Sequence, residues 1–85
     1  MRINKNFVVE KLDEGTAILL NPSNETIFIL NRTGHFVLTT ADDCERELAK
    51  ARYFDRTKLP LTEDYINDYC CFLDQLIENC IIVED

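Results

Sequence analysis

The stretch 26–38, with the sequence TIFILNRTGHFVL, constrains the fold most, because a β-prone segment runs directly into a helix start. Residues 26–30 are rich in β-branched and aromatic side chains, which favour strands. Asn31 then offers a side-chain oxygen that can cap a first helical turn, and apolar residues follow it. The sequence therefore predicts a strand over 26–30 and a helix from Asn31 to about Thr40, with no loop between them.

Two further strands are predicted before this junction. β-prone runs occupy about residues 7–12 and 16–20. Between them and the strand at 26–30 lie two turns rich in Asp, Gly, Asn and Pro, at 13–15 and 21–24. Three short strands joined by short turns indicate an antiparallel meander. Residues 1–6 are polar, and we expect them to form a loosely ordered lead-in.

Only helices and an apolar tail are predicted after the junction. Asp42 and Glu45 have capping-box spacing, which predicts a second helix ending near Tyr53. Its inward face should carry three residues at helical spacing, namely Cys44, Leu48 and Ala51. The apolar residues 80–83 should return to the sheet. The expected fold class is α+β, a three-stranded antiparallel sheet followed by three helices.

The third helix is predicted from a Thr62 cap to about Glu78. It carries two adjacent apolar stripes, and these are Ile66, Cys70, Leu73, Ile77 and Tyr65, Tyr69, Phe72, Leu76. The spacing predicts a buried Cys70 and an exposed Cys71. Two interpretations remain open. The wide stripe packs on the sheet and both other helices, or its aromatic half lines a groove beside the third strand.

The strand at 26–30 is apolar on both faces, because Phe28 and Leu30 point one way and Ile27 and Ile29 the other. A small exposed sheet normally has one polar face. Either both faces of this sheet are covered, or an apolar strip is available to a partner.

Size and charge limit the classes of function. A chain of 85 residues forms one domain with one modest core. Nine Lys and Arg oppose sixteen Asp and Glu, and residues 59–85 contain seven acids and no Lys or Arg. This segment would repel nucleic acid. Its acids either solvate an exposed helix face or attract a partly basic polypeptide.

The cysteines and the amino-terminal sequence predict a reduced, soluble, cytoplasmic protein. The chain opens without an apolar export signal, and its longest apolar runs are far shorter than a membrane span. Four cysteines without a C-x-x-C motif are then expected to be free thiols. A zinc site from these thiols and His35 is the less favoured alternative. We expect neither metal nor cofactor, and His35 should be a surface or boundary residue.

The order of these motifs resembles the PqqD family, also called RiPP recognition elements. The residues that carry the resemblance are Leu30-Asn31 closing a strand, Arg32-Thr33-Gly34 opening a helix, the charged segment 44–51, and the aliphatic-aromatic segment 69–85. It covers about residues 7–83. The chain departs from the family pattern after the first helix, where Asp42-Asp43 stands in place of Asp-Gly, at Cys80, and in having no Trp near Leu38.

The resemblance implies a winged-helix-like domain over residues 1–85 that is not an enzyme. Such domains bind the leader segment of a ribosomally made precursor peptide as an added strand. A separate enzyme, such as a radical-SAM enzyme, a cyclase or a leader protease, then modifies the peptide. Nucleic acid and membrane are not expected partners.

An exposed strand edge offers unpaired backbone groups that an extended peptide can satisfy. We therefore expect the peptide to bind the third strand and the aromatic wall of the third helix, with Asp64 and Asp68 favouring a basic leader. The predicted site residues are Thr26, Ile27, Phe28, Ile29, Leu30, Tyr65, Asp68, Tyr69, Phe72 and Leu76.

Two other functions fit the sequence less well. A DNA-binding winged-helix regulator would use the third helix as its reader, but that helix is acidic and has no Lys or Arg. A metal- or thiol-dependent enzyme would need a nucleophile paired with a base, and no such pairing is evident in the sequence.

Overall fold

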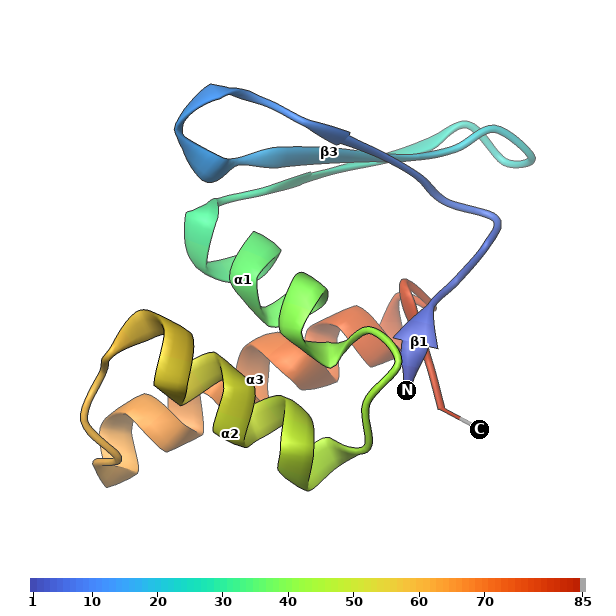
Figure 1. The fold of residues 1–85 in the computed structure, drawn as a ribbon. Helices are drawn as coiled ribbons and strands as arrows, with labels where there is room; N and C mark the ends of the chain where they lie inside the picture. Colours follow the sequence, from blue (N-terminus) through green and yellow to red (C-terminus); the bar gives the residue numbers. More distant parts are fainter. Residues whose placement is uncertain (85) are drawn as a thin grey trace.

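The computed structural model describes residues 1–84 and has an α+β fold with three helices and two antiparallel sheets (Figure 1). The larger sheet has the order β2-β3-β4, and its strands are β2 (Val8–Lys11), β3 (Ala17–Asn21) and β4 (Thr26–Leu30). The helices are α1 (Arg32–Ala41), α2 (Arg46–Thr57) and α3 (Glu63–Glu78). A smaller sheet pairs β1 (Arg2–Ile3) with β5 (Ile82–Val83).

The predicted meander is confirmed. β3 is central and antiparallel to both neighbours, with Leu19 opposite Val9 on one side and Phe28 on the other. The first turn is a short 3-10 segment, η1 (Asp13–Gly15), in which Gly15 has a φ of 80°. Glycine adopts this left-handed conformation without steric cost, as the tight connection requires.

The junction between β4 and α1 is also confirmed. β4 ends at Leu30, and the Asn31 side chain accepts a hydrogen bond from the Gly34 amide at 2.7 Å. Asn31 is thus the N-cap of α1, and the strand passes into the helix through this single residue. A Cβ atom at Gly34 would lie 3.5 Å from Leu30 Cδ2, so strand end and helix pack closely here.

The predicted start and orientation of α2 are wrong. The Asp42 carboxylate accepts a hydrogen bond from the Ile3 amide at 3.0 Å, and Asp43 has a left-handed φ of 58°. These two features delay the helix start to Arg46, with Glu45 at the N-cap position and no side-chain cap bond. The helix also continues beyond Tyr53 to Thr57.

The buried face of α2 differs accordingly. Its buried residues are Ala49, Tyr53 and Phe54, whereas Leu48 is 51% exposed and Ala51 is exposed. Cys44, the third member of the predicted inward face, is buried but precedes the helix. The large aromatic side chains therefore determine which side of α2 faces the core.

The bounds of α3 agree with prediction, and Thr62 caps its first turn by accepting from the Tyr65 amide. The centre of its buried face lies on Tyr69, Leu73 and Leu76, which come from both predicted stripes. Cys70 follows Tyr69 by about 100° around the helix axis and is exposed, contrary to prediction. Cys71 is exposed as predicted.

The two chain ends form the small sheet, which the sequence did not predict. Residues 1–6 were expected to be a loosely ordered lead-in, and 80–83 to return to the main sheet. Instead Ile3 pairs with Ile82, and the Asn4 amide donates to the Ile81 carbonyl at 2.8 Å. The reason is burial, because Ile81 and Ile82 are 1% and 2% exposed and Ile3 packs against the same core.

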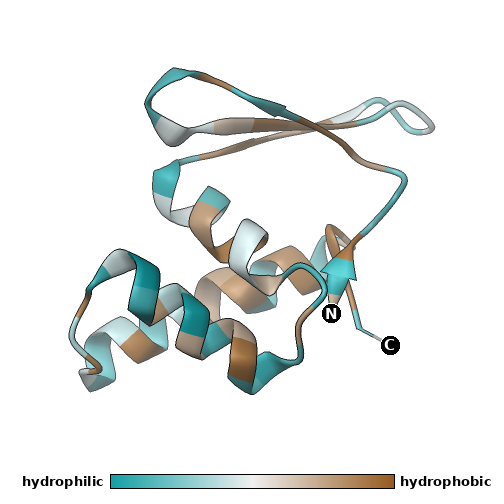
Figure 2. Ribbon diagram, in the orientation of Figure 1, coloured by the Kyte–Doolittle hydropathy of each residue, from teal (hydrophilic) through white to brown (hydrophobic). Residues whose placement is uncertain are grey.

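The core lies mainly among the three helices and extends to the inner face of the main sheet at Leu19. In Figure 1 the sheet lies above α1, with α2 and α3 below it. Hydrophobic segments gather on β3, β4, α1 and α3, while α2 is mostly hydrophilic (Figure 2). The largest fully buried side chains include Leu19, Val37 and Leu38. In the described part of the chain, no helix has the length and apolar character needed to cross a membrane.

Candidate functional site

β4 has a free edge and an uncovered apolar face. Among the described strands it pairs with β3 alone, so alternate backbone groups along its other side have no strand partner. Ile27 and Ile29 are 62% and 76% exposed, whereas Phe28 and Leu30 are half-buried against the core. The sheet is therefore covered on one face only, which decides between the two interpretations of this strand.

The exposed isoleucines belong to a wider apolar surface, which we call the outer sheet face. Leu20 lies between Val8 and Ile27 in the register, and Ile18 lies opposite Ile29. Alternate residues of paired strands project to one side of a sheet. The apolar residues of the outer sheet face are therefore Val8, Ile18, Leu20, Ile27 and Ile29, and Glu10 lies on the same face opposite Ile18. Three of these apolar residues are at least half exposed, namely Val8, Ile27 and Ile29.

A hollow of about 390 Å³, here called the β4–α3 groove, lies beside the end of β4. The strand end forms one side through Ile29 and Leu30, and α3 forms the other through Phe72 and Leu76. Gly34 of α1 also lines the groove, where a Cβ atom would lie 3.3 Å from Asn31 Oδ1 and 3.5 Å from Leu30 Cδ2. The lining residues are Thr16, Ile29, Leu30, Asn31, Gly34, Phe72, Gln75 and Leu76.

Four of the ten predicted site residues meet in this groove: Ile29, Leu30, Phe72 and Leu76. Thr26, Ile27 and Phe28 lie further back along β4. Tyr65 and Asp68 are exposed on α3 but do not line the groove.

The prediction that Tyr69 lines the groove is wrong. It is 2% exposed, and its ring lies 4.8 Å from that of Tyr53 between centroids, in an aromatic cluster with Phe54. Burial raises the pKa of Tyr69 to about 12, and its hydroxyl has no hydrogen-bond partner among the described residues. This residue therefore belongs to the core.

Four groove residues were not predicted, namely Thr16, Asn31, Gly34 and Gln75. Gln75 lies one turn from Phe72, so helical spacing contained a signal for it. Thr16 comes from a distant turn, and only the strand pairing places it here.

The β4–α3 groove is lined without a charged side chain. Asp68, which was expected to attract a basic leader at the site, acts on Tyr53, whose pKa is raised by burial and then by the Asp68 carboxylate. The groove therefore offers apolar contact and hydrogen bonding to uncharged groups, both backbone groups and the side chains of Thr16, Asn31 and Gln75.

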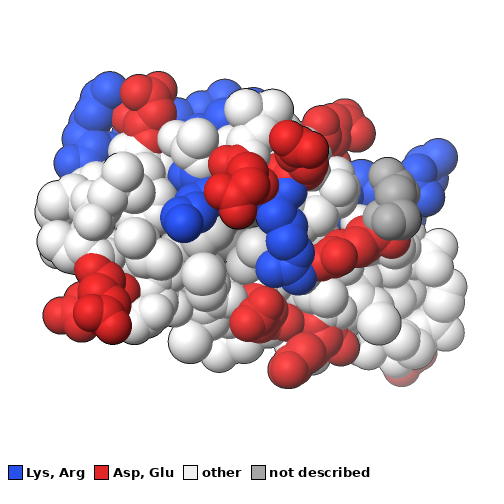
Figure 3. All heavy atoms as spheres, turned by 90° about the horizontal axis from the view of Figure 1, so that it is seen from below, with Lys and Arg blue, Asp and Glu red and all other residues white. Residues whose placement is uncertain are grey.

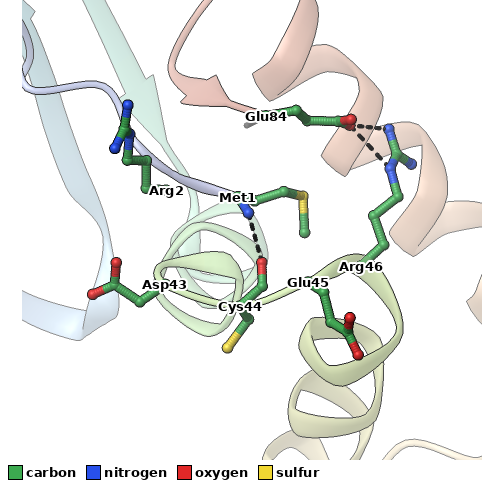
Figure 4. Close-up of a pocket in the computed structure, with 7 residues that line it drawn as sticks. All are labelled: Met1, Arg2, Asp43, Cys44, Glu45, Arg46 and Glu84. Atoms are coloured by element: carbon green, nitrogen blue, oxygen red, sulfur yellow. Dashed lines mark hydrogen bonds and ion pairs between the residues drawn. The ribbon is translucent and has the colours of Figure 1, made fainter.

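Other hollows lie away from β4. The one in Figure 4 is polar, with a hydrogen bond from the Met1 amino group to the Cys44 carbonyl at 2.7 Å and an ion pair between Arg46 and Glu84. A hollow of about 590 Å³ between α2 and the start of α3 is lined by Phe54, Leu59 and Leu61 among others. Neither contains a predicted site residue.

The acids do not form one continuous surface in the view from below. Figure 3 shows separate groups of Asp and Glu with Lys and Arg between them. All four cysteines are free, and Cys44 alone is buried. Among residues 1–84, no three His, Cys, Asp or Glu side chains are placed to hold a metal ion.

Comparison with known proteins gives no match to a family model, to a curated protein or to a solved structure. The site is therefore interpreted from its own geometry.

Proposed function

We propose that this protein binds an extended peptide, the leader segment of a ribosomally made precursor, by strand addition to the free edge of β4. It would hold the peptide for a separate modifying enzyme. The observation that carries the proposal is the uncharged, partly apolar β4–α3 groove beside β4, an edge strand that pairs with β3 alone among the described strands.

The geometry supports strand addition in two ways. An added strand would satisfy the unpaired backbone groups of β4. Alternate side chains of that strand would then point toward the groove, beside Leu30 and Phe72, or toward the outer sheet face, beside Ile27 and Ile29. A peptide with apolar residues on both sides would bury surface that is now exposed.

The proposal keeps the winged-helix-like, PqqD-like interpretation of the chain. Two features support it, the three-stranded meander that leads into three helices and the direct passage from β4 into α1 at Leu30-Asn31. The small sheet of β1 and β5 is an addition to that plan.

A peptide-display selection tests the proposal. The immobilised full chain is used to select binders from random fifteen-residue peptides, and the affinity of each is measured by fluorescence anisotropy. Ile29→Asp should weaken binding by roughly tenfold or more, because it places a charge where an apolar side chain would be buried. The fold should be unaffected, since Ile29 is 76% exposed.

Val8→Asp is the matched control. Val8 lies on the same outer sheet face but on β2, the opposite edge strand, and is 50% exposed. Its substitution should leave the affinity unchanged. Equal losses in both variants would indicate a general surface effect, and no loss in either would contradict the assignment to β4.

A further inference from the structure

Basic side chains converge on a hollow on another side of α1, away from the β4–α3 groove. We call it the basic hollow; its volume is about 340 Å³, and it lies between η1, α1 and α2. Three of its seven lining residues are cations, Lys11, Arg32 and Arg56. Such a grouping is unexpected in a chain with a net charge of −7.

These three cations have no ionic partner among residues 1–84. The ion pairs there are Arg46 with Glu84 and Lys58 with Asp55, and neither includes a residue of the basic hollow. None of the three side chains donates a hydrogen bond to a described residue. Cations gathered without a counter-charge repel one another, and a bound anion removes that repulsion.

Gly15 contacts two side chains that line the hollow, Arg32 and His35. The Arg32 chain lies across Gly15, because a Cβ atom there would come within 3.1 Å of Arg32 Cγ. His35 has its Nδ1 atom 3.0 Å from the Gly15 carbonyl oxygen, which assigns the proton to Nδ1 as donor. The Nε2 atom of the same ring is buried and has no hydrogen-bond partner among residues 1–84.

A second hollow of about 290 Å³ adjoins the first and shares Arg32, Phe36 and Arg56 with it. It adds apolar surface from Leu59 and the ring of Tyr53. The combined surface therefore offers cationic side chains, Lys11, Arg32 and Arg56, together with apolar ones such as Phe36 and Leu59.

We propose that this surface binds an acidic polypeptide segment in which carboxylates alternate with apolar side chains. The carboxylates pair with Arg32, Arg56 and Lys11, and an apolar side chain packs on Phe36 and Leu59. Guanidinium groups bind carboxylates through two parallel hydrogen bonds, which favours arginine at such positions. The segment belongs to a partner protein, and its binding is independent of peptide addition to β4.

Three features favour this ligand over a nucleic acid or free phosphate. The rest of the molecule is acidic, so a long polyanion is repelled outside the hollow. Asp68 acts electrostatically on Tyr53 of the second hollow, so a negative charge stands at the apolar end of the surface and disfavours a polyanion that continues past it. A free phosphate would leave the apolar part of the surface unused.

An NMR titration of the ¹⁵N-labelled full chain tests the proposal. The probe is acetyl-Glu-Glu-Leu-Glu-Glu-Leu-amide, and the control peptide has Gln in place of each Glu. The acidic probe should shift the amides of Gly15, His35, Thr39 and Arg56, and the Gln peptide should not. In the Arg32→Gln/Arg56→Gln variant the affinity for the acidic probe should fall roughly tenfold or more.

The matched control is Lys5→Gln/Lys50→Gln, which removes the same two charges outside the basic hollow and should change the affinity less than about twofold. Lys11→Gln/Arg56→Gln gives a second test that leaves Arg32 in place over Gly15. Equal binding of the Gln peptide, unchanged affinity in both hollow variants, or shifts confined to β4 would overturn the proposal. Tighter binding of sodium phosphate or a deoxythymidine hexamer would also overturn it.

Discussion

At the scale of single residues, local chemistry is predictable when the side chain acts on its own backbone neighbourhood. Asn31 caps α1 as its position in the sequence predicts. Asp42 has equally good capping chemistry, but it accepts from the amide of Ile3, which is distant in sequence. No local pattern contains that contact, so the predicted start of α2 was wrong.

Replacing Asn31 by Ala should reduce the free energy of unfolding by about 1 kcal/mol, because the Gly34 amide loses its acceptor. Urea denaturation followed by circular dichroism measures this. Asn67→Ala is the control, since Asn67 is exposed within α3 and Ala favours helix. Equal effects in the two variants would contradict the capping role of Asn31.

Tyr69 should make the free energy of unfolding depend on pH in the alkaline range. Burial raises its pKa to about 12 in the folded state, against about 10 in the unfolded chain. Its contribution is therefore fully present below pH 10 and is lost as the pH rises toward 12, on the order of 2 kcal/mol in total.

Comparing wild type with Tyr69→Phe in urea at several pH values between 9 and 12 checks this. The variant should be as stable as wild type or slightly more stable at pH 8, because the removed hydroxyl has no hydrogen-bond partner within residues 1–84. It should then lose less stability than wild type as the pH rises. Parallel curves would show that Tyr69 does not titrate differently in the two states.

At the scale of elements, periodicity located the strands and helices better than it oriented them. α2 has few apolar residues, and they are spread around its circumference. Its sequence is therefore compatible with more than one inward face. The rings of Tyr53 and Phe54 determine the inward face, because they cluster with Tyr69 of α3. The predicted face with Leu48 would have left these rings outside the core.

Leu48→Gln should therefore change the free energy of unfolding by less than about 0.5 kcal/mol, because the side chain is 51% exposed. Leu73→Ala, at a position 3% exposed, should cost roughly 2–5 kcal/mol through loss of contact and a cavity. Thermal or urea unfolding of both variants measures the difference. A large loss of stability in Leu48→Gln would contradict the orientation of α2, in which Leu48 faces outward.

At the scale of the whole molecule, the candidate site joins segments that are distant in sequence. Strand β4 with an apolar outer face was predictable from Ile27 and Ile29, and helix α3 from its stripes. Their meeting at Ile29, Leu30, Phe72 and Leu76 depends on how α1 packs between them. The small sheet of β1 and β5 is likewise a product of tertiary contact, since its strands have two residues each.

Amide hydrogen exchange along β4 tests the central claim most directly. In the free protein, alternate amides of 26–30 should exchange rapidly, because one side of this edge strand pairs with none of the strands in residues 1–84. Addition of a selected peptide should slow these amides by roughly tenfold or more, while β2 amides keep their rates. A peptide that binds and leaves the exchange of β4 unchanged would contradict strand addition.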